Sequence, residues 1–152
     1  LSEVTKSNTA IRRGIDNTPT DLHIINLKYL AEKVFQPIRE HFGSAIYVSS
    51  GYRSKALNEA IGGSKTSFHS HGMALDLDMD GRSNKITNAD IFNYIKENLP
   101  YSELIWEFGT EENPNWVHVA IAKGREDEKI TKIAYKYNYS KTQYKAWDKK
   151  LK

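Results

Sequence analysis

Histidine and aspartate residues are concentrated in one short stretch, SFHSHGMALDLDMDG, which spans residues 67–81. Two of the five histidines, His69 and His71, lie two residues apart and just ahead of three closely spaced acids. Imidazole nitrogens and carboxylate oxygens are ligands for divalent metals, so this spacing is compatible with a metal site. A solvated turn could have the same composition, and the elements that carry these residues must decide between the two interpretations.

The chain contains no cysteine among its 152 residues. Disulfides, thiolate metal sites and cysteine nucleophiles are therefore excluded, and a metal could be held only by histidine, aspartate or glutamate. The hydrophobic content of 39% and charged content of 27% are typical of a soluble globular domain with a real core. A net charge of +3 is too mild to indicate nucleic acid, although it permits attraction to an anionic cell-wall polymer.

Two stretches of alternating polar and apolar residues predict strands that carry candidate ligands. Residues 72–79, GMALDLDM, would place Asp76 on a face opposite to the apolar side chains. Residues 115–122, NWVHVAIA, would place His118 on a face where one neighbour is small. The opposite faces of the two strands would supply the core through Leu75, Leu77, Val117, Val119 and Ile121.

His69 would reach the same point if the loop before the first strand bends toward it. The set of candidate ligands would then be His69, Asp76 and His118. Three protein ligands with a fourth position open for water is the arrangement of catalytic zinc sites, where zinc lowers the pKa of its water to about 7. The spacing alone leaves this interpretation beside a simpler one, a satisfied turn plus a core histidine.

A long helix is predicted over residues 17–43. It would begin near Thr20, bend or break at Pro37 and stop at Gly43. Residues at helical spacing would form its buried stripe, namely Leu22, Ile25, Tyr29, Leu30, Val34 and Ile38.

Shorter elements complete the pattern. Helices are expected over residues 54–61 and 89–99, the second capped by Asn88. Residues 104–108, LIWEF, would form a hairpin with the strand that carries His118 through the polar turn GTEENPN. The predicted fold class is therefore α+β, with a small, mainly antiparallel sheet backed by helices.

The end of the chain differs in composition. From about Arg125 onward it is rich in lysine with interleaved tyrosine and tryptophan. We therefore expect a domain over residues 1–124 and a basic, aromatic-containing extension over residues 125–152. A basic solvated face explains this composition most simply, and binding to an anionic cell wall or to nucleic acid are the alternatives.

Several motifs resemble those of one enzyme family. SFHSHGMALDLD fits the pattern Ser-x-His-x-x-Gly-x-Ala-x-Asp, and WVHVA fits the second ligand segment, of the zinc D-Ala-D-Ala carboxypeptidase and L-alanyl-D-glutamate endopeptidase family. SGYRSKALNEAIGGSKTS, LIWEFG and TKSNTAIRRGIDNTP also resemble its compact, phage-associated branch. The likeness runs from about residue 3 to residue 122, and it implies the hedgehog/DD-peptidase fold.

The resemblance implies roles for five residues. His69, Asp76 and His118 match the family's zinc ligands. Arg53 matches an arginine that contacts substrate or stabilises the developing oxyanion, which suits a permanently charged group able to bind a carboxylate in a bidentate way. Ser67 matches the serine of the ligand motif, a hydrogen-bond donor to substrate.

The general base is where this sequence departs from the pattern. Many relatives carry an acid three residues before the last ligand, but that position is Asn115 here, and an amide cannot take a proton. The compact branch instead has a glutamate in the LIWE strand, where Glu107 stands. Since Glu107 and His118 would lie on adjacent strands, we expect Glu107 to be the catalytic base. Weaker candidates are Glu103, Glu111 and Glu112.

The function of two further residues stays open at this stage. His71 occupies a variable position of the motif, and we expect it to face solvent. Asp78 either orients a histidine ligand or is simply a carboxylate at the edge of the sheet.

Together these implications predict a zinc-dependent peptidase that cuts peptidoglycan stem peptides, of the D-Ala-D-Ala carboxypeptidase or L-Ala-D-Glu endopeptidase type, and an endolysin. We expect Zn²⁺ as cofactor, a monomer, no membrane insertion and no nucleic acid. Because the N-terminus lacks a signal pattern, we expect synthesis in the cytoplasm and action at the bacterial cell wall after phage-type release. A non-catalytic, zinc-containing cell-wall-binding module of the same fold is the alternative, and a basic nucleic-acid-binding protein is a weaker one.

Overall fold

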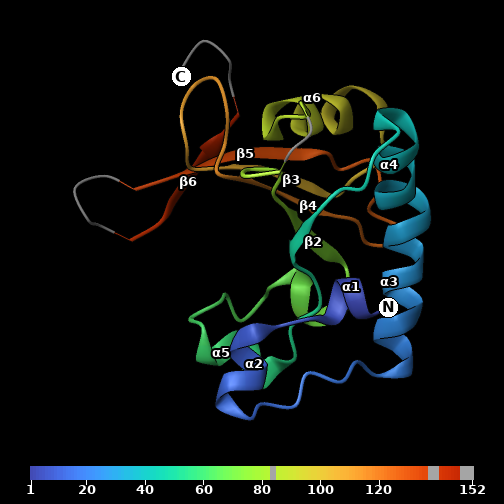
Figure 1. Ribbon diagram of the computed structural model, residues 1–152, viewed down its shortest axis with the longest axis vertical. Helices are drawn as coiled ribbons and strands as arrows, with labels where there is room; N and C mark the ends of the chain where they lie inside the picture. Colours follow the sequence, from blue (N-terminus) through green and yellow to red (C-terminus); the bar gives the residue numbers. More distant parts are fainter. Residues whose placement is uncertain (83–84, 137–140, 148–152) are drawn as a thin grey trace.

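A six-stranded sheet organises the molecule (Figure 1), and the computed structural model describes residues 1–82, 85–136 and 141–147. The strand order is β1-β2-β4-β3-β5-β6, and neighbouring strands run antiparallel except β3 and β5, which are parallel. The strands are β1 (Val48–Ser50), β2 (Ala74–Leu77), β3 (Glu103–Glu107), β4 (Trp116–Ala120), β5 (Ile130–Tyr135) and β6 (Gln143–Ala146). The predicted α+β class with a mainly antiparallel sheet is confirmed.

Some helices cover one face of this sheet, and others lie at one end of the molecule (Figure 1). A continuous helix of α3, η1 and α4 packs with α6 on the same face, whereas α2 and α5 lie together at the other end and α1 contacts β1. Their bounds are α1 (Ser2–Thr5), α2 (Asn8–Arg13), α3 (Asp21–Leu30), the π-helical turn η1 (Ala31–Phe35), α4 (Gln36–Phe42), α5 (Lys55–Ala60), the 3-10 turn η2 (Phe68–His71) and α6 (Asn88–Asn98). None of the helices in the described ranges has the length and hydrophobicity to cross a membrane.

The long helix continues through its proline. It starts at the cap residue Thr20 and ends at Gly43, which has the left-handed φ of 59°. Pro37 lacks an N–H group, and the turn before it is widened, with the Gln36 N–H donating to the carbonyl of Ala31. The helix thus accommodates Pro37 with one π-type turn and does not break there.

The predicted buried stripe of this helix is wrong at its start. Leu22 and Ile25 are 63% and 51% exposed, whereas Asn26 and Leu27 are buried. The first turns pack against η2, where the Asn26 side chain donates to the carbonyl of His71 at 2.9 Å. This tertiary contact selects a different face from the one that hydrophobicity predicts. Tyr29 is half-buried, and the stripe is buried as predicted at Leu30, Val34 and Ile38.

The predicted cap of helix α6, Asn88, is wrong, because Thr87 caps this helix. Thr87 Oγ1 accepts from the Asp90 N–H, and the Asp90 carboxylate accepts from the Thr87 N–H, each at 3.0 Å. Asn88 is buried and uses its side chain elsewhere, accepting from the Met79 N–H and donating to the carbonyl of Pro114. Asn88 therefore ties the end of β2 to the turn before β4.

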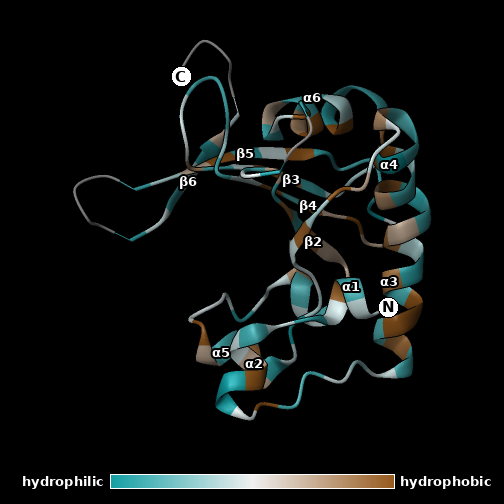
Figure 2. Ribbon diagram, in the orientation of Figure 1, coloured by the Kyte–Doolittle hydropathy of each residue, from teal (hydrophilic) through white to brown (hydrophobic). Residues whose placement is uncertain are grey.

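The two faces of the sheet have opposite character. Figure 2 shows hydrophobic residues along α3, α4 and the central strands, and mostly hydrophilic residues around α2 and β6. The face toward the long helix and α6 carries the predicted core residues Leu75, Leu77, Val117, Val119 and Ile121, all buried. The other face is polar and carries Asp76, Glu103, Glu107 and His118.

Strands β5 and β6 come from the segment predicted to be a C-terminal extension. β5 pairs with β3 along the whole length of β3, and Ile133 of β5 packs in the main core. β6 then pairs with β5. Within the basic tail, residues 137–140 and 148–152 lie outside the described residues, so the predicted character of that part is not addressed by the structure.

Candidate metal centre

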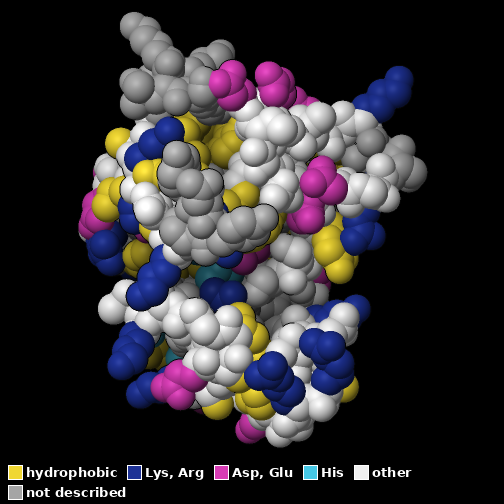
Figure 3. All heavy atoms as spheres, turned by 90° about the vertical axis from the view of Figure 1, so that its left-hand side faces the viewer, with side chains coloured by type: hydrophobic (Ala, Val, Ile, Leu, Met, Phe, Trp, Pro, Cys, Tyr) yellow, Lys and Arg dark blue, Asp and Glu magenta, His cyan; other side chains and the backbone are white. Residues whose placement is uncertain are grey.

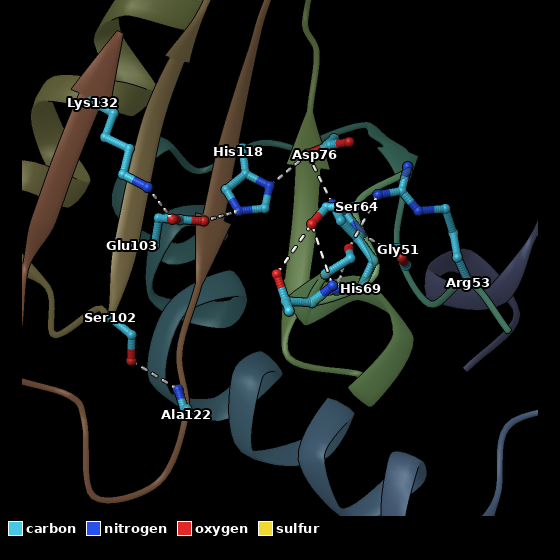
Figure 4. A network of polar contacts seen from close by, with 12 residues as sticks. Gly51, Arg53, Ser64, His69, Asp76, Ser102, Glu103, His118, Ala122 and Lys132 are labelled. Carbon is cyan, nitrogen blue, oxygen red and sulfur yellow. Dashed lines mark hydrogen bonds and ion pairs between the residues drawn. The ribbon is translucent and has the colours of Figure 1, made fainter. Parts of the chain in front are cut away.

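The structure brings the side chains of His69, Asp76 and His118 to one point. Each residue offers one ligand atom, and these atoms all lie within 4.8 Å of one another. His69 comes from η2, whereas Asp76 of β2 and His118 of β4 are directly paired across the sheet. Figure 4 shows both histidines linked to Asp76, so the three side chains form a candidate metal site.

His69 is oriented by the backbone. Its Nδ1 atom lies 2.7 Å from the carbonyl oxygen of Gly51 and donates to it, because a carbonyl can only accept. The Nε2 atom keeps its lone pair and lies 3.2 Å from Asp76 Oδ1. Nε2 is therefore the atom of His69 that can bind a metal.

The tight turn η2 explains the residues around His69 in the motif. Ser67 caps the turn by accepting from the His69 N–H at 3.2 Å. Gly72 ends the turn with a left-handed φ of 72°, and an added Cβ there would lie 2.6 Å from the carbonyl oxygen of His23 in α3. Only glycine allows both this turn and the close approach of the long helix.

His118 is oriented by side chains. Its Nε2 atom lies 3.0 Å from Glu103 Oε1, and its Nδ1 atom lies 3.1 Å from Asp76 Oδ1. The other oxygen of Glu103 accepts from Lys132 Nζ at 2.9 Å (Figure 4). An outer carboxylate that accepts from a ligand histidine is frequent around protein-bound metals, and it leaves Nδ1 of His118 as the ligand atom.

The electrostatics favour a positive charge where the three ligand atoms meet. Burial alone would raise the pKa of Asp76, but the charge of His69 and hydrogen bonds from both histidines hold that pKa well below its usual range. Burial would lower the pKa of His118, but its hydrogen bonds to Asp76 and Glu103 raise the pKa to about 9. Burial also opposes ionisation of Glu103, yet hydrogen bonds from His118 and Lys132 lower its pKa to about 2.

The distances and the donor set fit a tetrahedral zinc ion. Ligand atoms bound at zinc lie about 2.0–2.1 Å from the ion, which separates neighbouring ligands by about 3.3 Å. Asp76 Oδ1 lies 3.2 Å from His69 Nε2 and 3.1 Å from His118 Nδ1. Two imidazole nitrogens and one carboxylate oxygen form a donor set that suits this metal.

Glu107 lies on the same face of the sheet as these ligands, diagonally across from His118. Glu107 lines the cleft that also contains His69, Asp76 and His118, and it is only 7% exposed. Burial raises the pKa of Glu107 to about 7. The neighbouring carboxylates add to this shift, whereas His118 and Arg53 oppose it. A pKa near neutrality suits a group that takes up and releases a proton.

Arg53 lines the cleft beside η2. Its Nη2 atom donates to Ser67 Oγ at 3.5 Å, whereas its Nε atom is buried without a hydrogen-bond partner in the described part of the chain. Burial lowers the pKa of Arg53, and the charges of Asp76 and Glu107 act against this change. Because an unsatisfied buried N–H group is costly, this guanidinium favours an acceptor supplied by a bound molecule.

An open cleft of about 630 Å³ joins these groups. Figure 3 shows a hollow between two parts of this face of the molecule, with a histidine side chain visible at its floor. The polar face of the sheet forms one side of the cleft, and the segment around Ser67 forms another. Lys132 and Tyr144 contribute a third side from β5 and β6. This volume lies within the range of small-molecule and peptide-binding pockets.

The four candidate bases differ in position and in contacts. Glu111 and Glu112 lie in the exposed turn between β3 and β4 and line a different pocket. Glu103 lies at the centre, but both of its oxygens are used, by His118 and Lys132. Among the four acids, Glu107 is the buried carboxyl that lines the cleft without such a bridging role.

The structure also places three further residues that the sequence analysis discusses, His71, Asp78 and Asn115. His71 is exposed, as predicted. Asp78 accepts from the Asn88 side chain at 3.0 Å, so among its two interpretations the structure favours a carboxylate at the end of the strand. Asn115 is exposed, and its N–H donates to the carbonyl of Glu107.

The sequence predictions do not include Lys132 and Tyr144, and they name Glu103 only as a weaker candidate base. The role of Glu103 had a detectable signal, because period-two alternation puts Glu103 and Glu107 on the same face of β3. Lys132 and Tyr144 had no local signal. Their position depends on the pairing of β5 with β3 and of β6 with β5, which joins segments far apart in the chain.

One known protein family matches most of the chain. A family model described as Peptidase M15 matches residues 1–120, which include all three candidate ligands. No match to a curated protein accompanies it. The match ends with β4, so β5 and β6 lie beyond it. The chain therefore belongs to the peptidase M15 family, with the hedgehog/DD-peptidase fold that this family implies and with His69, Asp76 and His118 as the candidate metal site of a metallopeptidase.

Proposed function

We propose that the protein is a zinc-dependent peptidase that hydrolyses peptide bonds in the stem peptides of bacterial peptidoglycan, as a phage-type endolysin. One observation carries the catalytic part: three potential ligand atoms meet beside a buried carboxyl, Glu107, in an open cleft. Family membership supports peptide-bond hydrolysis. The peptidoglycan substrate and the phage-type setting are supported by the resemblance of the ligand motifs and of the LIWEFG strand.

Zinc would be held by His69 Nε2, Asp76 Oδ1 and His118 Nδ1. Three protein ligands leave one coordination position open, as catalytic zinc requires. When bound, zinc supplies Lewis acidity that activates water and polarises the scissile carbonyl.

Glu107 would act as the general base. Its carboxylate would accept a proton from the attacking water and then donate that proton to the leaving amine. In the metal-free site, burial raises the pKa of Glu107, which favours proton uptake by this carboxylate. The exposed amide at Asn115 can do neither.

Arg53 would bind a substrate carboxylate or the developing oxyanion. Arg53 lines the cleft, and a guanidinium can bind a carboxylate through two N–H groups. Ser67 would help to orient substrate, because its oxygen accepts hydrogen bonds from His69 and Arg53 while its O–H hydrogen is free to donate.

Digestion of purified sacculi tests this proposal. Wild type, Glu107→Ala and the control Glu111→Ala, an exposed acid of the same hairpin, would each be incubated with and without added zinc. Mass spectrometry would read the new peptide ends. We expect zinc-dependent ends from wild type and Glu111→Ala but not from Glu107→Ala, and the ends identify the bond that is cut. Full activity of Glu107→Ala would contradict the assignment of the base.

A second candidate function is a zinc-containing, non-catalytic module that binds the cell wall. The observation that favours it is Asn115, which replaces the acid that many relatives carry at this position. Stoichiometric zinc together with sacculus binding, but no new ends from any stem peptide, would favour this module over the peptidase.

A further inference from the structure

We propose that Lys132 is a positioning residue for the metal centre: it holds Glu103 in the orientation in which Glu103 holds His118 as a ligand. The inference rests on the proposed zinc site. It assigns to β5, which lies beyond the segment that matches the family, a direct part in that site.

The contacts form an uninterrupted chain, visible in Figure 4. Lys132 Nζ lies 2.9 Å from Glu103 Oε2, and Glu103 Oε1 lies 3.0 Å from His118 Nε2. Each carboxylate oxygen of Glu103 therefore has its own partner. Rotation of this carboxylate would break at least one of the two hydrogen bonds, so the pair of contacts fixes its orientation.

The register of the sheet makes this arrangement possible. Ile105 of β3 is paired with His118 on one side and with Lys132 on the other. The three residues therefore share one face of the sheet, and Glu103 projects from the same face two residues away. From that place the carboxylate can bridge the strands on both sides of its own.

The bridge determines which nitrogen of His118 faces the metal. As long as Nε2 donates to Glu103, the lone pair of the neutral imidazole is on Nδ1, the atom beside Asp76. A carboxylate acceptor also makes the imidazole a stronger ligand. Without the Lys132 cation, Glu103 would be a half-buried carboxylate with no lysine counter-charge and free to leave His118.

A merely structural ion pair would have different consequences. Lys132 and Glu103 are partly shielded, with side chains 34% and 17% exposed, and such a pair contributes little to stability. If the pair acts only on stability, its loss should lower the melting temperature slightly and leave the zinc affinity unchanged. If it positions His118, its loss should weaken zinc binding in a protein that still folds.

Zinc affinity, measured on the full chain by competition with a chromogenic chelator, distinguishes these cases. We expect Glu103→Gln to weaken zinc binding about 10- to 100-fold, as loss of outer partners of metal ligands does. We expect a smaller loss for Lys132→Met, about three- to tenfold, because Lys132 acts one step further away. Lys132→Arg keeps the charge and should restore most of the affinity.

Lys145→Met is the matched control. Lys145 belongs to the same β5–β6 hairpin, but it pairs with Ile133 and so projects from the opposite face of the sheet. Its removal should leave zinc affinity unchanged. The double variant Glu103→Gln with Lys132→Met should bind zinc no more weakly than Glu103→Gln alone, since Lys132 acts through Glu103.

Each outcome has a definite meaning. Melting curves in the presence of a chelator establish that every variant is folded before its affinity is compared. Wild-type zinc affinity in Lys132→Met, whatever the result for Glu103→Gln, would overturn the inference while leaving the proposed peptidase intact. A wild-type protein that binds no zinc would overturn the proposed function and this inference together. An additional loss in the double variant would show that Lys132 does not act through Glu103 and would also overturn it.

Discussion

The two histidines of the centre are held in different ways. His69 donates to a backbone carbonyl at Gly51, whereas His118 donates to the side chain of Glu103, which is held by Lys132. A backbone acceptor keeps its place as long as the local fold is intact. The Glu103 acceptor also depends on the rotamers and the charges of Glu103 and Lys132. The position of His69 should therefore be sensitive to backbone displacement, and that of His118 to single side-chain substitutions.

The largest effect is expected from removal of His118, the ligand that side chains hold in place. His118→Ala leaves only two ligands, so zinc affinity should fall by more than about 100-fold and turnover should be lost. Bound zinc per chain and chelator competition measure this directly. His71→Ala is the control, since His71 is exposed and close to the site in sequence. Tight, stoichiometric zinc in His118→Ala would remove His118 from the ligand set.

Substitution of the proposed base should separate chemistry from metal binding. Glu107→Gln keeps the shape of the side chain but cannot take a proton, so kcat should fall by about 10²- to 10⁴-fold. Zinc affinity should stay close to that of wild type, because Glu107 is not among the three ligands. Rates of stem-peptide cleavage at saturating zinc provide the test. An unchanged kcat would exclude Glu107 as the base.

Gly51→Ala should displace the backbone acceptor of His69. An added Cβ would overlap the backbone oxygen of Val4, so the Gly51 segment must shift and move the acceptor of His69. We expect a stability loss of about 2 kcal/mol and zinc binding weakened about tenfold. Urea unfolding and chelator competition measure the two effects.

Gly62→Ala is the control that distinguishes backbone strain from displacement of the Gly51 carbonyl. Gly62 has a left-handed φ of 75° but no heavy atom within 4 Å of an added Cβ. Gly62→Ala should therefore lose about 1 kcal/mol of stability without a change in zinc affinity. Equal zinc affinities in the two glycine variants would show that the Gly51 carbonyl does not position His69.

A further prediction concerns the pH dependence of stability in the metal-free protein. The pKa of Glu107 is raised from 4.5 to about 7 on folding, so the folded state binds more protons between these values and stability falls as pH rises through this window. Glu107→Gln removes this loss. It should be more stable than wild type by about 2–3 kcal/mol at pH 8, with a smaller difference at pH 4.5. Parallel pH profiles of urea unfolding for the two proteins would contradict the raised pKa.

The two faces of the sheet could be predicted from local sequence patterns. Alternation with period two is a local property of a strand, so it was enough to assign Leu75 and Val119 to the core and Asp76 and His118 to the polar face. The turn around His69 is also local, because Ser67 caps it and Gly72 closes it within a few residues. These features account for most of the candidate ligand set.

Features that depend on distant partners could not be predicted from local patterns. Leu22 and Ile25 have the spacing of a buried stripe, but η2 packs on a different face of the helix and leaves them exposed. Asn88 is a good cap residue, but the turn before β4 uses its side chain and leaves the cap to Thr87. The contact of Lys132 with Glu103 requires the parallel pairing of β5 and β3, which no local pattern encodes. Such pairings are selected by the packing of the whole chain, because their free energy comes from burial shared among distant segments.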